Sequence, residues 1–291
     1  MTTMNKKIAR SFDSWHFAMM NDDTRNKSLE YCFRTMSLAD KTVLEIGTGA
    51  GLTAIQMAKA GARHIYTCKF NLQLFEVAKT VIAQSPYANK ITVFDKHSSE
   101  IFLKEQPRFD VIFSETLDCG VIGEGFYTVA NDIRRLADEN TTIITNKVQQ
   151  FGYLVESKDL HQLNCCLSSS EPALEAINSF STETYFPVRI RNFEILPLSD
   201  PVLIKEYCYL DDQPKKHVSQ KVNSNRSSCC HGLISFFNAH FGRSIISNTS
   251  LSTAGHWHQA YHPLKTPRNL TAGESYQISI NLNGKVEANN A

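Results

Sequence analysis

One segment, 43–51, constrains the fold of this 291-residue chain more than any other. A short apolar run carrying Glu45 leads into three alternating glycines, Gly47, Gly49 and Gly51, and a helix-like pattern follows directly. Glycines permit a tight turn and let the backbone approach a bound group closely. The exposed amides at the start of a helix then face that group. The segment therefore predicts a strand, a ligand-binding turn and a helix in succession.

The first half of the chain alternates between strand-like and helix-like patterns. The strand-like runs are 43–46, 64–68, 91–94, 109–113 and 142–144, and the helix-like runs are 52–60 and 72–83. A further helical segment, about 14–33, precedes them and is interrupted by a polar run at 21–24. Strands that alternate with helices of this length indicate βαβ units and a mainly parallel sheet. We expect an α/β fold here.

The pattern changes near residue 148. Short strand-like runs follow at 151–155, 185–195, 202–209, 231–237 and 276–280, and polar turns separate them. The segment 160–179 looks partly helical. We therefore expect an α/β half followed by a mostly β half.

Charge and composition exclude several classes of protein. Thirty Lys and Arg against 29 Asp and Glu give a net charge of +1, so no basic field favours nucleic acid. The apolar runs are too short to span a membrane, and the N-terminus lacks the apolar core of a signal peptide. The eight cysteines show no C-x-x-C spacing, which favours reduced thiols over disulfides or zinc. We expect a soluble cytoplasmic protein with no metal and with no nucleic-acid or membrane partner.

Two glutamates stand out after the fourth strand-like run. Glu115 and Glu124 are nine positions apart, and Gly120, Gly123 and Gly125 permit a turn between them. Two carboxylates that face one small site repel each other unless a cation neutralises them. A guanidinium suits that role because it is planar, always charged and able to bind both acids. The alternative is a pair of solvated loop acids.

These motifs together carry a family resemblance. The glycine segment lacks the dinucleotide spacing G-x-G-x-x-G, because Leu52 stands three positions after Gly49, and it resembles the first motif of class I methyltransferases, which bind S-adenosylmethionine. With the loop 115–125 and a later Gly-His-Trp at 255–257, the chain is similar to the protein arginine methyltransferases over roughly 8–265. The amino-acid sequence of the loop resembles that of the subgroup with two tandem methyltransferase modules in one chain, which includes monomethylating enzymes.

The resemblance implies a domain organisation. Residues 1–40 would form a helical lid over the cofactor, and 41–148 a Rossmann-like domain that binds S-adenosylmethionine. Residues 149–291 would form a β-barrel-like substrate domain, with an inserted helical arm at about 160–179. Relatives form head-to-tail homodimers through such an arm, so a homodimer is expected.

The resemblance also assigns residues to the acceptor side of the site. Glu115 and Glu124 would grip the substrate guanidinium, and Trp257 would form a wall of its pocket. Asp22 matches a family aspartate that pairs with a loop histidine, here His256. The proton lost from the acceptor nitrogen would pass to Glu124 or to the His256–Asp22 pair.

On the cofactor side, Arg25 would hold the methionine carboxylate and Met19 would line the sulfonium. The complete set implied for the cofactor is Arg25, Glu45, Gly47, Gly49, Gly51, Lys69, Ser98 and Met19. Ser98 lies where the fold takes the adenine.

The chain departs from the family pattern at three places. Lys69 stands where relatives have a carboxylate for the ribose hydroxyls, and Gly255 replaces a threonine. The aromatic pair that covers the cofactor has only Phe12 and Trp15 as candidates. The resemblance implies an S-adenosylmethionine-dependent methyltransferase that acts on a guanidino nitrogen, either in protein arginine or in a small guanidine. The alternative from another class is a catalytically silent binding or dimerisation module.

Overall fold

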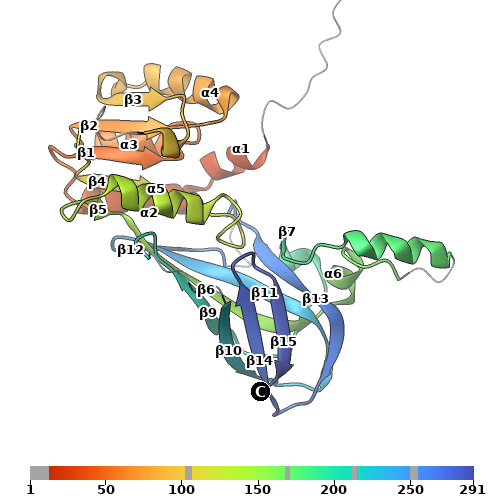
Figure 1. Ribbon diagram of the computed structural model, residues 1–291. Helices are drawn as coiled ribbons and strands as arrows, with labels where there is room; N and C mark the ends of the chain where they lie inside the picture. The colour runs from red at the N-terminus through yellow and green to blue at the C-terminus, as the bar shows by residue number, and fades with distance from the viewer. Residues whose placement is uncertain (1–12, 102–106, 168–170, 212–214, 216, 250–254) are drawn as a thin grey trace, which may run out of the picture. The chain divides into compact units, whose positions relative to one another are not determined.

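The computed structural model describes residues 13–101, 107–167, 171–211, 215, 217–249 and 255–291 (Figure 1). The chain forms two compact units. The first comprises Met1–Ser114 and Glu139–Ile143, and the second comprises Glu115–Asp138 and Ile144–Ala291. These boundaries do not test the predicted functional domains, whose boundaries at residues 40 and 148 stay a prediction.

The first unit contains a five-stranded parallel sheet in the order β3-β2-β1-β4-β5 (Figure 1). Its strands are β1 Thr42–Ile46, β2 His64–Cys68, β3 Ile91–Phe94, β4 Val111–Ser114 and β5 Thr142–Ile143. Its later helices are α3 Leu52–Lys59 and α4 Leu72–Ala83, with short 3₁₀ turns η1 Ala88–Lys90 and η2 Ser98–Glu100. All five residues of β1 are buried, as expected for a central strand. The predicted α/β fold with a parallel sheet is confirmed.

The predicted N-terminal helical segment consists of two helices, and the break between them lies in the predicted polar run 21–24. These are α1 Trp15–Met20 and α2 Asp23–Thr35. The break occurs because the Asp22 carboxylate caps α2, accepting a hydrogen bond from the Arg25 amide at 3.0 Å. Helix α2 is anchored to the sheet through Phe33, whose ring meets the Phe113 ring edge-on at 5.1 Å.

The second unit contains two antiparallel sheets. A seven-stranded sheet has the order β7-β13-β11-β6-β8, with β12 paired to β11 and β9 paired to β6, and a three-stranded sheet has the order β10-β14-β15. The strands are β6 Thr145–Glu156, β7 Phe186–Val188, β8 Leu196–Pro197, β9 Val202–Tyr207, β10 His217–Asn223, β11 Ser228–Phe241, β12 Ser244–Ser247, β13 Gln259–Leu270, β14 Ser275–Asn281 and β15 Val286–Asn290.

One apolar core joins the two sheets of this unit. Leu154 on β6 and Leu233 on β11 belong to the same buried cluster as Tyr276 and Ile278 on β14. Because both sheets face one core, they enclose it as a β-barrel-like domain. The predicted β-rich second half is confirmed.

Several elements differ from the sequence-based expectation. The run 185–195 contains only the short strand β7, followed by a 3₁₀ turn η4 Ile190–Asn192. The segment 160–179 is partly helical as predicted, since its described residues include the end of α6 Lys158–Gln162 and most of η3 Pro172–Phe180. Helix α5, Phe126–Leu136, and strand β13 were not predicted. Two prolines, Pro263 and Pro267, hide the strand pattern of β13.

All eight cysteines carry free thiols. Within the described ranges, no helix combines the length and apolar character needed to cross a bilayer. The same residues include no cluster of three or more potential metal-binding side chains.

Candidate active site

The glycine loop follows β1 in the first unit and requires its glycines. Gly47, Gly49 and Gly51 have φ values of 93°, 56° and 94°, a region that side chains disfavour. Gly51 is also the N-terminal cap of α3. The loop therefore turns sharply from the end of the strand into the helix, as the sequence predicts, and presents backbone rather than side chains.

Met19 lies directly against this loop. A Cβ atom placed at Gly49 would be 3.2 Å from the Met19 methyl carbon, so the close approach depends on glycine. At Gly51, an added Cβ would come within 3.0 Å of Ile82 on α4. The first contact brings a predicted cofactor residue onto the loop, and the second fixes how closely α3 approaches α4.

Glu45 occupies a different environment from the other predicted cofactor residues. Its side chain is fully buried and accepts hydrogen bonds from the hydroxyls of Thr53 and Thr67, the latter at 2.6 Å. Burial raises the pKa of the Glu45 carboxyl, while the two threonine hydroxyls and the nearby Arg25 charge oppose that rise. Because Thr53 lies on α3 and Thr67 on β2, Glu45 on β1 connects the start of α3 to the neighbouring strand β2.

Arg25 and Asp22 are both buried at the start of α2. Arg25 is 3% exposed, and its Nη1 donates to the Asn26 side-chain oxygen at 2.7 Å. Its charge is the smallest of the effects that oppose the rise of the Glu45 pKa. Asp22 serves as the helix cap, a role that sequence reasoning did not assign to it.

Lys69 lies at the predicted position, immediately after β2, and its amide donates to the Phe94 carbonyl at 3.1 Å. The pKa of His16 on α1 is lowered to about 4, mainly by burial and secondly by the Lys69 charge. Lys69 therefore lies within electrostatic reach of α1. The nearby Asn71 caps α4, because its side-chain oxygen accepts from the Leu74 amide at 3.0 Å.

Ser98, the predicted adenine contact, is buried at the start of η2. The preceding His97 and the following Glu100 form a reciprocal cap around this turn. The Glu100 carboxylate accepts from the His97 amide at 2.8 Å. The turn is therefore fixed at the end of β3, on the first unit.

The glutamate hairpin, residues 115–125, opens the second unit and is organised around Asp118. The Asp118 carboxylate accepts hydrogen bonds from the amides of Gly120 and Gly123, at 3.2 and 2.9 Å. Its second oxygen accepts from the Tyr185 hydroxyl at 2.9 Å. Burial raises the pKa of the Asp118 carboxyl, and these three hydrogen bonds oppose that rise. A Cβ at Gly120 would be 2.3 Å from the Tyr185 ring, so the packing requires glycine there.

The two predicted guanidinium ligands flank this turn. Glu115 is half-buried and Glu124 is exposed, and Gly125 adopts a φ of 82° before α5 begins. The Glu124 charge raises the pKa of the buried Cys119 thiol, as a secondary effect after burial and Asp118. That the two glutamates converge on one ligand stays a prediction.

Trp257 lies against the same hairpin. Its ring nitrogen donates to the Leu117 carbonyl at 2.8 Å, and its ring meets Phe237 edge-on at 5.3 Å. The start of this loop is held by Arg189, whose Nη1 donates to the Gly255 carbonyl at 2.9 Å. Gly255 stands where the resemblance implies a threonine and so lacks a hydroxyl. Hydrogen bonds from Arg189 and Trp257 nevertheless hold residues 255 and 257.

The structure groups the predicted residues within each unit. The first unit gathers Met19, Arg25 and Glu45 around the glycine loop, and the second gathers the glutamate hairpin and Trp257. The Asp22–His256 pair spans both units and stays a prediction. Phe12 lies outside the described residues.

Sequence reasoning missed Tyr185 and Arg189. Asp118 carries a local signal, because an Asp side chain favours a turn in which it accepts from the amide two residues later, here that of Gly120. Tyr185 is 67 positions from Asp118, so no local pattern connects them.

Comparisons with known proteins agree on a methyltransferase fold. The family model described as ribosomal protein L11 methyltransferase matches residues 22–150. An arginine N(omega)-methyltransferase of Streptomyces achromogenes subsp. streptozoticus is 30% identical over 93% of this chain and 76% of that protein. The protein arginine N-methyltransferase 1 of Oryza sativa subsp. indica is 24% identical over 93% of this chain and 73% of that protein.

A third relative matches only part of the chain. The mouse protein arginine N-methyltransferase 9 is 34% identical over 39% of this chain, which covers 14% of the mouse protein. Among solved structures, the Trypanosoma brucei PRMT1 enzyme–prozyme heterotetrameric complex with AdoHcy has a TM-score of 0.79 at 19% identity. That match covers 95% of this chain and 93% of the other, and it supports the fold of both units.

Proposed function

This chain belongs to the arginine N-methyltransferase family, and we propose that it methylates a guanidino nitrogen of arginine with S-adenosylmethionine as its cofactor. The proposal rests on the presence of two features in one chain. One is a glycine loop that presents backbone without side chains. The other is a hairpin that carries two glutamates and is held by Tyr185 and Trp257. Both features are intact, which favours an enzyme over a catalytically silent module.

The residues of the first unit fit the cofactor. The glycine loop presents backbone without side chains, and Met19 lies over Gly49, where an apolar side chain suits a methylthio group. The buried Arg25 would bind the amino-acid carboxylate through a charge-assisted hydrogen bond. Ser98 would lie near the adenine and Lys69 near the ribose. Glu45 would act as a positioning residue that holds the loop.

The residues of the second unit fit the acceptor. Glu115 and Glu124 would bind the guanidinium, orient the attacking nitrogen and draw the positive charge toward the other nitrogens. Trp257 would close one side of the pocket. When bound, S-adenosylmethionine supplies a methyl group on a cationic sulfur. Glu124 or His256, the latter oriented by Asp22, would accept the proton that the acceptor nitrogen loses, and holding both reactants in place would supply much of the rate.

We propose free arginine or a small arginine derivative as the preferred acceptor. A net charge of +1 provides no acidic field to steer the cationic tails that protein-modifying relatives act on. The Streptomyces relative, named for arginine itself, is 30% identical to this chain, while the rice protein, named for protein arginine, is 24% identical over the same share.

We further propose a homodimer formed through the arm. Large apolar side chains are exposed on the arm and the segments beside it: Leu163, Leu167, Leu174, Ile177 and Phe180. Phe180 is 86% exposed, a cost that burial against a second copy would remove. A cytoplasmic location remains part of the proposal, because eight free thiols suit a reducing compartment.

One assay tests the function and the acceptor class. Purified protein is incubated with methyl-labelled S-adenosylmethionine and, in parallel, with free arginine, agmatine or an Arg/Gly-rich peptide. We expect label in free arginine at a kcat/KM above that for the peptide. A higher kcat/KM for the peptide would overturn the small-molecule assignment, and label in none of the three would overturn the enzymatic one.

A further inference from the structure

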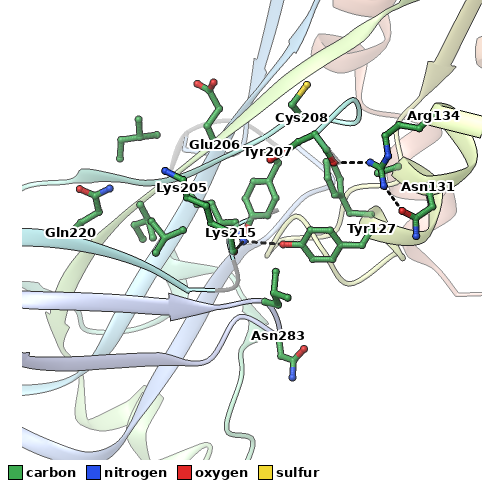
Figure 2. Close-up of a pocket in the computed structure, with 17 residues that line it drawn as sticks. Tyr127, Asn131, Arg134, Lys205, Glu206, Tyr207, Cys208, Lys215, Gln220 and Asn283 are labelled. Atoms are coloured by element: carbon green, nitrogen blue, oxygen red, sulfur yellow. Dashed lines mark hydrogen bonds between the residues drawn. The ribbon is translucent and has the colours of Figure 1, made fainter. Parts of the chain in front are cut away.

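The second unit contains a cavity that does not include the glutamates of the hairpin or Trp257 (Figure 2). Its volume is about 620 Å³, within the range of small-molecule sites. Side chains from α5, β9 and β10 line it, together with Leu282 and Asn283 after β14. The cavity is large enough for an organic molecule rather than for a few waters.

Lys205 on β9 is the unusual residue of this cavity. It is 6% exposed, and its Nζ donates to the Tyr127 hydroxyl at 2.9 Å, marked in Figure 2, and to the Lys215 carbonyl at 3.5 Å. The ammonium also lies 4.9 Å from the centre of the Tyr207 ring and 5.6 Å from that of Tyr127. A buried cation is thus held by neutral oxygens and aromatic faces.

Within the described ranges, no carboxylate forms an ion pair with this ammonium. Glu206 also lines the cavity, but its carboxylate lies 3.6 Å from the Lys147 ammonium and accepts a hydrogen bond from Gln149 at 3.0 Å. Burial lowers the pKa of Lys205 to about 8, and the opposing effect of the Asp211 charge is smaller. A buried charge without close compensation is unfavourable, and an anionic ligand would remove that cost.

Two residues of α5 add to what the cavity offers an anion. Tyr127 contributes a neutral hydroxyl donor, and Arg134 contributes a second positive charge. Burial raises the pKa of Tyr127 to about 12, so its hydroxyl keeps a proton that it can donate. Arg134 Nη1 donates to the carbonyls of Tyr209 at 3.0 Å and Asp211 at 2.7 Å, which fixes a second cation at the cavity wall. Leu203, Val218 and Leu282 supply apolar wall.

We propose that this cavity binds a small organic anion, a carboxylate or a phosphate ester, whose oxygens accept hydrogen bonds from the Lys205 ammonium and the Tyr127 hydroxyl. The charge-assisted hydrogen bond from Lys205 supplies the recognition of the anion. The apolar wall accommodates the organic part. None of the residues that line the cavity belongs to the proposed acceptor or cofactor sites.

Calorimetry with phenyl phosphate and benzoate tests this site, with inorganic phosphate and benzylamine as comparison ligands. We expect at least one aryl anion to bind more tightly than inorganic phosphate, and benzylamine not to bind. Lys205→Met should weaken the aryl anion roughly tenfold or more, as expected for the loss of a charge-assisted hydrogen bond. Lys59→Met, which removes the same charge on α3 in the first unit, should leave the affinity unchanged.

Tyr127→Phe provides a second variant in case Lys205→Met does not fold, because it removes one hydroxyl and keeps the ring. It should weaken the aryl anion several-fold. Equal affinity in the wild type and in the folded variants would overturn the proposal, and so would the absence of binding by both aryl anions at roughly 10 mM. Tighter binding of benzylamine than of either anion would also overturn it.

Discussion

Lys69 is the residue at which this chain departs most from the family pattern on the cofactor side. A carboxylate can accept from two ribose hydroxyls, whereas an ammonium can only donate. Its charge already acts on His16, and Asn71 is occupied as a helix cap. We therefore expect weak binding of S-adenosylmethionine for this fold.

Lys69→Glu should improve the affinity for S-adenosylmethionine by roughly tenfold, about 1.5 kcal/mol, because it restores an acceptor for the ribose. It should also raise the pKa of His16 above its value of about 4, because a negative charge favours the imidazolium. Calorimetry measures the first effect and NMR titration the second, with Lys79→Glu as a control on exposed α4. Weaker cofactor binding by Lys69→Glu would show that the lysine meets an anionic group.

Arg25→Ala should weaken S-adenosylmethionine and S-adenosylhomocysteine equally, because both carry the same amino-acid carboxylate. Losing a charge-assisted hydrogen bond is expected to cost about 1.5–3 kcal/mol. Arg34→Ala, in the last turn of the same helix, serves as the control. Unchanged affinity for both ligands in a folded Arg25→Ala protein would place the carboxylate elsewhere.

Among the elements, the glutamate hairpin is held by a residue that is distant in the sequence; we call the hydrogen bond from Tyr185 to Asp118 the Tyr185–Asp118 lock. Tyr185 holds the Asp118 carboxylate that in turn holds the amides of Gly120 and Gly123. Tyr185→Phe removes only the hydroxyl, so the hairpin should loosen while the ring packing is kept. The KM for the acceptor should rise several-fold, and cofactor affinity should not change. Steady-state kinetics against a Tyr31→Phe control measures this, and an unchanged acceptor KM would remove the lock from the account.

A buried polar chain crosses the β-barrel-like domain and makes its stability sensitive to acid. Tyr207 donates to Gln150 at 2.8 Å, and Gln150 donates to Ser235 at 3.0 Å. Ser235 bonds His262 Nε2 at 2.8 Å, and His262 Nδ1 bonds the Gly284 carbonyl at 2.7 Å. These partners assign the proton to Nδ1, and burial lowers the pKa of His262 to about 4.

Because the folded-state pKa of His262 lies below the unfolded value near 6.5, its contribution to stability is complete above pH 6.5. That contribution should be lost as pH falls toward 4, by about 3 kcal/mol. Other histidines add to the total slope, so the test compares His262→Gln with the wild type. Urea unfolding followed by Trp257 fluorescence in a Trp15→Phe background should show a shallower slope for His262→Gln. Identical slopes would contradict this assignment.

Across the whole molecule, the sequence predicts those structural features whose signals lie in residues close together along the chain. The alternation of strand and glycine predicts β1, the loop and the start of α3, because each signal lies within ten positions. The polar run 21–24 likewise predicts the break between α1 and α2. Strand β13 was not predicted, because Pro263 and Pro267 interrupt its pattern. The Tyr185–Asp118 lock escapes because contacts between distant residues leave no local pattern.

The central claim is that the glutamate hairpin binds the acceptor guanidinium and the glycine loop binds the cofactor. Glu124→Gln tests it most directly, with Glu139→Gln as a control outside the hairpin. Calorimetry in the presence of S-adenosylhomocysteine should show arginine affinity reduced roughly tenfold or more, from the loss of one charge-assisted hydrogen bond, and methyl transfer should fall accordingly. Affinity for S-adenosylhomocysteine itself should not change. Arginine affinity and turnover equal to the wild type in Glu124→Gln would contradict the account.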